Sequence, residues 1–310
     1  MQVRFLHARE NVPVPELQTG WESKRTFGIV YCNLAGPIDP VAKDGYKYVL
    51  SFVDVYTGMN MVYFLKQKSN TLEATEKFLS DIVPSGKIKR LWGKNGSEFM
   101  SKNFKSLLCR NAIKHEMSAP YSPHQTGTVE RVWQSLFDIA HCLLLEANLP
   151  GHLWPYAVLA LAYIRNRCFN SKLCKTPFDT LTGKQPHIGN MHLFSSTCFI
   201  SVQNTKKLDA RSKKGVFVGY DRENPAYLVY YPEVNEVKKV QCLKFLEQRF
   251  YQLEMGEREP FMPTPNTRKV ESRWAGLIWT HWAISNELSI LLLFQRISDW
   301  FRYEICISPI

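Results

Sequence analysis

The sequence has no cluster of cysteine and histidine that would indicate a zinc site or a disulfide-bonded framework. Its eight cysteines are scattered over 310 residues, and none belongs to a Cys-x-x-Cys pair. Structural zinc sites need four ligands at short, regular spacings, so we expect no zinc site. We interpret the cysteines as small, mostly buried side chains of a reducing compartment, which predicts an intracellular protein, nuclear or cytoplasmic.

Long uninterrupted hydrophobic runs are also missing. The first fifteen residues, MQVRFLHARENVPVP, have no apolar core of a signal peptide. The most apolar segment, WAGLIWTHWAISNELSILLLF, is interrupted by His281, Asn286 and Glu287. A membrane-spanning helix needs about twenty mostly uncharged residues, so we expect no membrane partner. We leave residues 1–25 unassigned and expect the Trp-rich tail, 251–310, to be poorly ordered or, alternatively, to dock on the core.

Acidic residues are scarce relative to basic ones. The chain has 39 Lys and Arg against 28 Asp and Glu, which gives a formal charge of +11 at pH 7. Its content of 45% hydrophobic and 13% aromatic residues is typical of a folded globular protein and excludes a disordered one. The positive charge favours a polyanionic partner, most simply nucleic acid, although a merely soluble basic protein stays open as an alternative.

The hydrophobic pattern of residues 26–185 predicts an α/β domain with a mixed sheet. Three strand-like segments come first and are followed by alternating helix and strand patterns. The first helix has Ser69 and Asn70 as capping residues and places Leu72, Leu79, Ile82 and Val83 near one face. The expected strands are 27–34, 46–56, 59–66, 87–92 and 113–119, and the expected helices are 69–83, 101–111, 128–148 and 153–167.

The hydrophobic pattern of the sequence changes in residues 186–250. The stretches CFISVQN, GVFVGYD, AYLVYYPE and EVKKVQCLKFLEQ are rich in β-branched and aromatic residues. Turns containing lysine, glycine or proline separate them, which indicates a small antiparallel β-barrel of SH3-like size.

Three polar positions stand where the predicted elements end or begin. Asn33 ends the first strand, Lys94 follows the fourth strand, and Glu130 begins the long helix, with 35 residues between the last two. This spacing resembles the Asp…Asp-(35 residues)-Glu pattern of retroviral-type integrases. The segments VYCNLAGPI, RLWGKNGSEF, HEMSAPYSPHQTGTVER and KLDARSKKGVFVGYD resemble copia-type retrotransposon integrases within Pol polyproteins, and the similarity extends over residues 26–248.

This resemblance implies an RNase H-like core with a mixed five-stranded sheet, followed by an SH3-like β-barrel. It also implies DNA strand transfer and 3′-end processing with Mg²⁺ or Mn²⁺ held by three carboxylates. At the aligned positions, Asn33 and Lys94 replace the two aspartates and only Glu130 is retained, which is insufficient as a metal site. Two unit charges about 4 Å apart interact by ~4 kcal/mol at an effective dielectric near 20, so a lysine strongly opposes a cation there.

Another acid could substitute for the lost ligands, and Asp39, Asp44, Asp54 and Glu98 are close in sequence. Asp54 and Glu98 match acids that the family already has, so neither is a new ligand. Two-metal catalysis tolerates little displacement of its ligands. We therefore expect no replacement and a catalytically inactive member of the polynucleotidyl transferase family.

The resemblance implies contacts to DNA and self-association into a homo-oligomer. The candidate DNA-binding residues are His124, Gln125, Arg131, Lys206, Lys207, Lys213 and Lys214. Lysine and arginine neutralise phosphates without sequence preference, but the same residues also suit a solvated surface. Three hypotheses stay open: an inactive integrase-like protein with weak DNA binding, a host-recruited DNA- or protein-binding module, and a decayed transposon remnant without a selected role.

Overall fold

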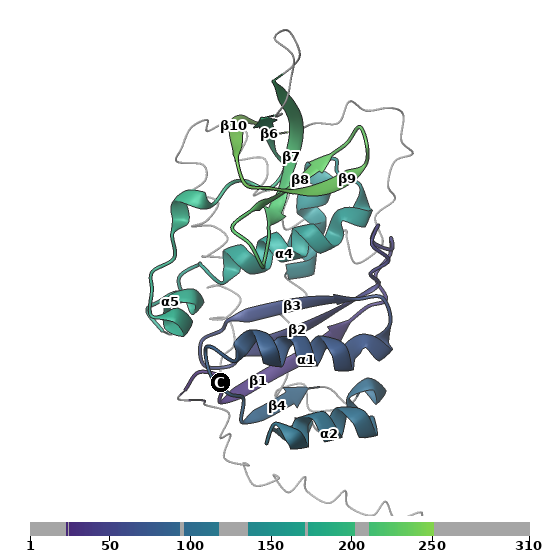
Figure 1. Ribbon diagram of the computed structural model, residues 1–310, viewed down its shortest axis with the longest axis vertical. Coiled ribbons are helices and arrows are strands. Elements are labelled where there is room, and N and C mark those ends of the chain that lie inside the picture. The colour runs from purple at the N-terminus through teal and green to yellow at the C-terminus, as the bar shows by residue number, and fades with distance from the viewer. Residues whose placement is uncertain are drawn as a thin grey trace, which may run out of the picture.

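The computed structural model describes residue 23 and the ranges 25–93, 96–117, 136–170, 173–201 and 211–250. Two five-stranded sheets are connected through helices, and one helix lies between them (Figure 1). No described helix is long and apolar enough to cross a membrane.

The first sheet has the strand order β3-β2-β1-β4-β5. The pairs β1–β2 and β2–β3 are antiparallel, whereas β1–β4 and β4–β5 are parallel. The mixed five-stranded sheet predicted from the sequence is therefore confirmed. Its strands are β1 (Ile29–Ala35), β2 (Tyr48–Asp54), β3 (Asn60–Leu65), β4 (Arg90–Gly93) and β5 (Lys114–Met117).

Side chains of β1 alternate between two buried faces, as a strand covered on both sides requires. Val30 and Cys32 belong to a core with α1 (Thr71–Ile82) and α2 (Lys102–Arg110). Tyr31 points to the other face, where Val49 and Val62 pack against the helical residues 136–146. By the same alternation Asn33 belongs to this second face.

Helix α1 departs from the sequence-based prediction in two details. Phe78 is a main buried residue on its inner face, whereas Val83, which we expected to face inward, is 70% exposed. Asn70 stands at the N-cap, but its side-chain oxygen accepts a hydrogen bond from the backbone N–H of Gln67 at 3.1 Å. The cause is a preceding 3₁₀ turn, Lys68–Asn70, which uses the capping group that the sequence assigns to the helix.

Helix α4 (Trp154–Arg165) is buried on nearly all sides. Eight of its twelve residues are buried, which is the pattern of a helix enclosed by protein rather than one lying on a surface. Figure 1 shows α4 between β3 and the second sheet. Pro155 lies in its first turn, where its missing N–H leaves no hydrogen bond unmade. A further short helix, α5 (Pro177–Thr182), lies outside the helices expected from the sequence, and the Thr176 hydroxyl oxygen accepts a hydrogen bond from the backbone N–H of Asp179 at its start.

The second sheet is antiparallel throughout, with the order β10-β6-β7-β8-β9. The last predicted strand stretch, 236–248, forms two strands that separate at residues 241–242. At Gly219 (φ +143°) the register shifts, and a Cβ there would lie 3.5 Å from the Cβ of Ala160 in α4. The strands are β6 (Ser196–Ser201), β7 (Ser212–Tyr220), β8 (Tyr227–Tyr231), β9 (Glu236–Val240) and β10 (Leu243–Phe250).

Candidate active site

Asn33 lies near the end of β1, in the middle of the first sheet. Its side chain is only 8% exposed, and its backbone pairs with Ser51 of β2. On the other side of β1, Cys32 pairs with Gly93, the last residue of β4. Lys94 follows Gly93 directly in the chain but lies outside the described residues. The parallel register therefore brings Asn33 and the end of β4, which directly precedes Lys94 in the chain, to the same edge of the sheet.

Strands β1 and β4 approach each other closely at this point. A Cβ at Gly93 would lie 2.6 Å from Sγ of Cys32 and 3.0 Å from its carbonyl oxygen, so only glycine fits. Burial raises the pKa of the Cys32 thiol to about 12, which makes it an inert core side chain rather than a nucleophile.

The other cysteines only partly match the expectation from the sequence. Cys198 is buried like Cys32, but Cys109, Cys174 and Cys242 are exposed. The prediction that most cysteines are buried is therefore wrong for the described residues.

Glu130 also lies outside the described residues, as do Lys94, His124, Gln125, Arg131, Lys206 and Lys207. The helical residues 136–146 downstream of Glu130 cover the face of the sheet to which Asn33 belongs. Leu136, Ala140 and Leu144 are buried there, with the helical spacing predicted from the sequence.

Asp54, the first spare carboxylate, holds the turn between β2 and β3. Its Oδ1 accepts a hydrogen bond from the Phe27 N–H at 3.1 Å. Its Oδ2 accepts from the N–H of Thr57 at 3.1 Å and from the Thr57 hydroxyl at 2.7 Å. Burial raises the pKa of Asp54, while the hydrogen bonds from Thr57 and Phe27 act in the opposite direction. Asp54 is thus a structural residue, paired with Val30 and not with Asn33.

The remaining spare acids lie in two other segments, the β1–β2 loop and the 3₁₀ turn after β4. Asp39 and Asp44 are exposed in the loop between β1 and β2, where Asp44 accepts a hydrogen bond from the Tyr156 hydroxyl at 3.2 Å. Glu98 lies in a 3₁₀ turn, Ser97–Met100, and its charge adds a small increase to the pKa of Cys32. It is therefore the spare acid whose charge reaches β1.

The donor set at the aligned positions does not fit a two-metal site. Asn33 offers a neutral amide oxygen, and lysine, which occupies position 94, cannot bind a metal while protonated. Within the described ranges, no three His, Cys, Asp or Glu side chains gather so that they could hold a metal ion. Glu130 alone would supply one carboxylate.

Two predicted DNA-binding lysines, Lys213 and Lys214, are exposed at the start of β7. Lys214 pairs with Phe199 of β6, and Phe199 pairs with Lys244 of β10. Directly paired residues point to the same face of a sheet, so two lysines flank a half-buried aromatic ring there. The sequence showed Lys244 only as part of a basic stretch, because pairing with Phe199 depends on the strand register.

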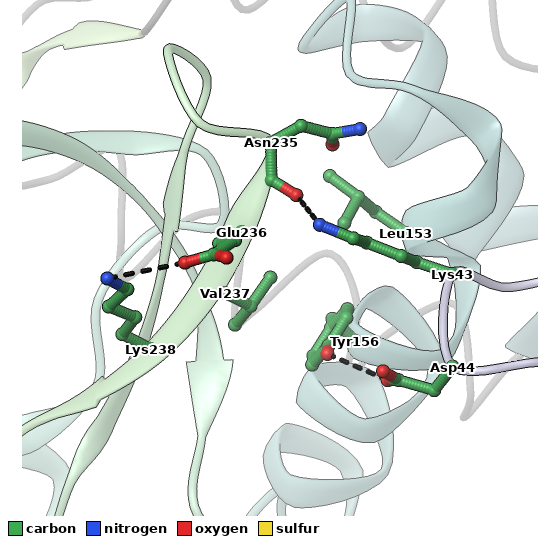
Figure 2. Close-up of a pocket in the computed structure, with 8 residues that line it drawn as sticks. All are labelled: Lys43, Asp44, Leu153, Tyr156, Asn235, Glu236, Val237 and Lys238. Atoms are coloured by element: carbon green, nitrogen blue, oxygen red, sulfur yellow. Dashed lines mark hydrogen bonds and ion pairs between the residues drawn. The ribbon is translucent and has the colours of Figure 1, made fainter.

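A cavity of about 290 Å³ opens between the two sheets and contains none of the predicted site residues. Figure 2 shows its charged side chains turned toward partners within the wall. Lys43 donates a hydrogen bond to the carbonyl of Asn235, and Lys238 lies 3.3 Å from Glu236. Lys43 and Lys238 thus interact with other residues of the cavity wall, which indicates a packing contact between elements of the chain. It is lined by Lys43, Asp44, Leu153, Tyr156, Asn235, Glu236, Val237 and Lys238.

Two family descriptions match the chain. Residues 34–123 match the integrase core domain, and residues 196–258 match the retroviral polymerase SH3-like domain. Together with the sheet order, these matches confirm the RNase H-like core and the SH3-like segment that follows it. The boundaries predicted for the individual domains stay predictions.

Curated relatives with similar sequences are Pol polyproteins. The retrovirus-related Pol polyprotein from transposon RE1 of Arabidopsis thaliana is 30% identical over 243 residues, which cover 76% of this chain and 16% of the relative. The corresponding protein from transposon TNT 1-94 of Nicotiana tabacum is 29% identical over 236 residues, covering 74% and 18%. The chain spans less than a fifth of the length of these relatives.

Among solved structures, the HTLV-2 integrase catalytic core domain in complex with magnesium (trimeric form) is 21% identical, with a TM-score of 0.41. The match covers 52% of this chain and 99% of that one. A chain of the simian T-cell lymphotropic virus intasome in complex with PP2A regulatory subunit B56 gamma is 18% identical, with a TM-score of 0.42, and the match covers 71% of this chain and 78% of that one.

Proposed function

Because this chain is an integrase-like protein derived from a retrotransposon Pol polyprotein, we propose that it is a copia-type integrase that has lost strand transfer and 3′-end processing but retains contact with DNA. The observation that carries this proposal is the identity of two residues at one edge of the first sheet. Asn33 lies near the end of β1, and Lys94 follows β4, the parallel neighbour of β1.

The chemistry of DNA strand transfer explains why these two residues matter. When bound, two Mg²⁺ ions about 3.5–4 Å apart stabilise the attacking and the leaving oxygen. Holding them requires converging carboxylates, which neutralise their charge. An amide and an ammonium group supply no negative charge, so Asn33 and Lys94 remove two of the three charges that this arrangement needs.

The spare acids support the loss of activity rather than a replacement. Asp54 is engaged by Phe27 and Thr57, and Asp44 faces Tyr156. Neither is available to join Glu130 without breaking these hydrogen bonds.

A second candidate is a DNA- or protein-binding module recruited by a host. The row of Lys214, Phe199 and Lys244 on the second sheet favours it, since this surface needs no carboxylates. Self-association and a nuclear or cytoplasmic location are proposed under either candidate. A decayed transposon remnant without a selected role is the remaining alternative.

The test is a joining assay with the purified chain and a labelled duplex that mimics a transposon end, in Mg²⁺ and in Mn²⁺. We expect no joined product from the native chain. The double variant Asn33→Asp/Lys94→Asp should regain metal-dependent joining, because it restores carboxylates at both positions and leaves the rest of the chain unchanged.

A triple variant that adds Glu130→Gln is the matched control and should be inactive again. Metal-dependent joining by the native chain itself would refute the proposal. A folded but inactive double variant would instead show that the decay extends beyond these two positions.

A further inference from the structure

Arg222, in the turn between β7 and β8, reaches across to the first sheet. Its Nη1 donates a hydrogen bond to the carbonyl of Val62 at 2.8 Å, and its Nη2 donates to the Tyr63 hydroxyl at 2.8 Å. Nη2 also lies 3.3 Å from Oδ2 of Asp81 in α1. One guanidinium therefore binds a backbone group of β3 and side chains of β3 and α1, residues that are more than 140 positions away in sequence.

The Tyr63 ring connects Arg222 with the hydrophobic core that the first sheet forms with α1 and α2. The Arg222 guanidinium carbon lies 4.2 Å from the centre of the ring, at cation–π distance. The ring packs edge-on against Phe52 and Phe78, with centroids 5.8 Å and 6.2 Å away. Burial raises the pKa of Tyr63, so its hydroxyl stays protonated and donates to Asp81 while it accepts from Arg222.

The turn that carries Arg222 is held in shape by Asp221. Oδ2 of Asp221 accepts hydrogen bonds from the backbone and side chain of Asn224, at 3.1 Å and 2.9 Å. Its Oδ1 lies 2.9 Å from the Lys239 ammonium. Burial alone would raise the pKa of Asp221, but the hydrogen bonds from Lys239 and Asn224 outweigh it and lower the pKa. The turn is thus held by contacts within the second sheet as well as by those that Arg222 makes to the first sheet.

A second turn of the same sheet makes a contact beside the N-terminal end of α4. Asn235, between β8 and β9, has a positive φ of 51° and accepts a hydrogen bond from Lys43 at its carbonyl (Figure 2). Its side-chain oxygen accepts from the Tyr230 hydroxyl at 3.1 Å and lies 3.2 Å from Nε2 of His152. Between the two turns, Val216 and Val218 of β7 share one hydrophobic core with α4 and the first sheet.

We propose that these contacts form a clamp, with Arg222 as its central residue, that holds the two sheets as one cooperatively unfolding body. The clamp consists of the Arg222 turn on β3 and α1, the Asn235 turn on the β1–β2 loop, and β7 on α4. It also covers β3, an edge strand of the first sheet, at the Val62 carbonyl. A covered edge is protected from pairing with a strand of another chain.

The strength of the clamp depends on Arg222 rather than on the neighbouring ion pair. Lys77 and Glu223 also bridge the two units at 3.0 Å, but their side chains are 55% and 62% exposed, so water screens them. Arg222 is 31% exposed and directs a planar set of donors to a carbonyl, a hydroxyl and a carboxylate. A lysine offers no such planar geometry.

The test measures amide hydrogen exchange and urea unfolding of the full chain. In the wild type we expect one unfolding transition for both sheets. Arg222→Gln should accelerate exchange at least about tenfold in β3, in the last turn of α1 around Asp81 and in the β7–β8 turn, because opening these segments no longer requires breaking the Arg222 contacts. Arg222→Lys should show a similar acceleration.

Glu223→Gln is the matched control, because it removes the exposed ion pair from the same turn, and exchange should change less than about twofold. If Arg222→Gln fails to fold, Tyr63→Phe removes one acceptor and keeps the ring, and should accelerate exchange at the same places to a smaller extent. The proposal would be overturned if amide exchange in β3 were as slow in all Arg222 and Tyr63 variants as in the wild-type protein. Separate unfolding of the two sheets in the wild-type protein would also overturn it.

Discussion

At the scale of single residues, Asp54 and Asn33 show how position decides what a polar side chain does. Asp54 is a buried carboxylate that a metal ion could use, but three hydrogen bonds commit it to the β2–β3 turn. Asn33 stands where a metal ligand would be expected but carries no charge. A carboxylate is therefore present in this region of the sheet, but not at the position where two strand ends meet.

The role of Asp54 is tested by Asp54→Asn. Its amide nitrogen would face either the Phe27 N–H or the two donors of Thr57, so at least one buried donor would lose its acceptor. We expect a loss of about 1–3 kcal/mol in the free energy of unfolding, measured by urea denaturation. Asp39→Asn, in the exposed β1–β2 loop, is the control, and equal stability of both variants would contradict the structural role of Asp54.

At the scale of elements, β5 and α2 pack through an aromatic contact that depends on protonation. The His115 ring of β5 lies 5.7 Å from the Phe104 ring of α2. Its Nε2 is buried and has no hydrogen-bond partner in the described part of the chain. Burial, followed by the charge of Lys105, lowers the pKa of His115 below 6.5. The fold therefore favours the neutral imidazole.

This lowered pKa predicts a loss of stability in acid. The stabilising effect is present above the unfolded pKa of 6.5 and is lost as the pH falls through the lower folded value. The free energy of unfolding should decrease as the pH falls below about 6.5, by at most about 1.4 kcal/mol per pH unit for this one proton. His115→Gln should show a shallower dependence, and an equal slope in both proteins would exclude His115 as the source.

At the scale of the whole molecule, α4 joins two sheets that the sequence presents as separate units. Val62 of the first sheet and Val216 of the second belong to the same hydrophobic core as Ala157 and Leu161 of α4. The lysines of the second sheet are therefore held in a fixed place relative to β1.

This arrangement predicts salt-dependent retention on DNA. Each phosphate contact contributes a slope of about −0.9 to the dependence of log K on log salt concentration. The double variant Lys214→Gln/Lys244→Gln, which removes the two lysines paired with Phe199 on one face of the sheet, should flatten the slope measured with a labelled duplex by about 2 if both lysines contact phosphates. Lys184→Gln, an exposed lysine outside the second sheet, should leave it unchanged. Full retention by the double variant would place the DNA contact elsewhere.

The sequence by itself determined the class of fold and the order of the strands along the chain, whereas the places of Asn33, Lys94 and Glu130 in the family pattern are implied by the motif resemblance and stay predictions. The fold class and the strand order follow from local patterns, namely alternation and helical spacing, which a linear chain displays directly. The short helix α5 and the inward face of α1 were predicted less well, because capping and packing by neighbours outweigh intrinsic preference there.

Only the tertiary structure decided which of these residues meet. The commitment of Asp54 to Thr57, the pairing of Lys214 and Lys244 with Phe199, and the reach of Arg222 to Tyr63 all depend on strand register and on the docking of the two sheets. Such contacts join positions far apart in the chain, and their energies come from burial and geometry that no local pattern records.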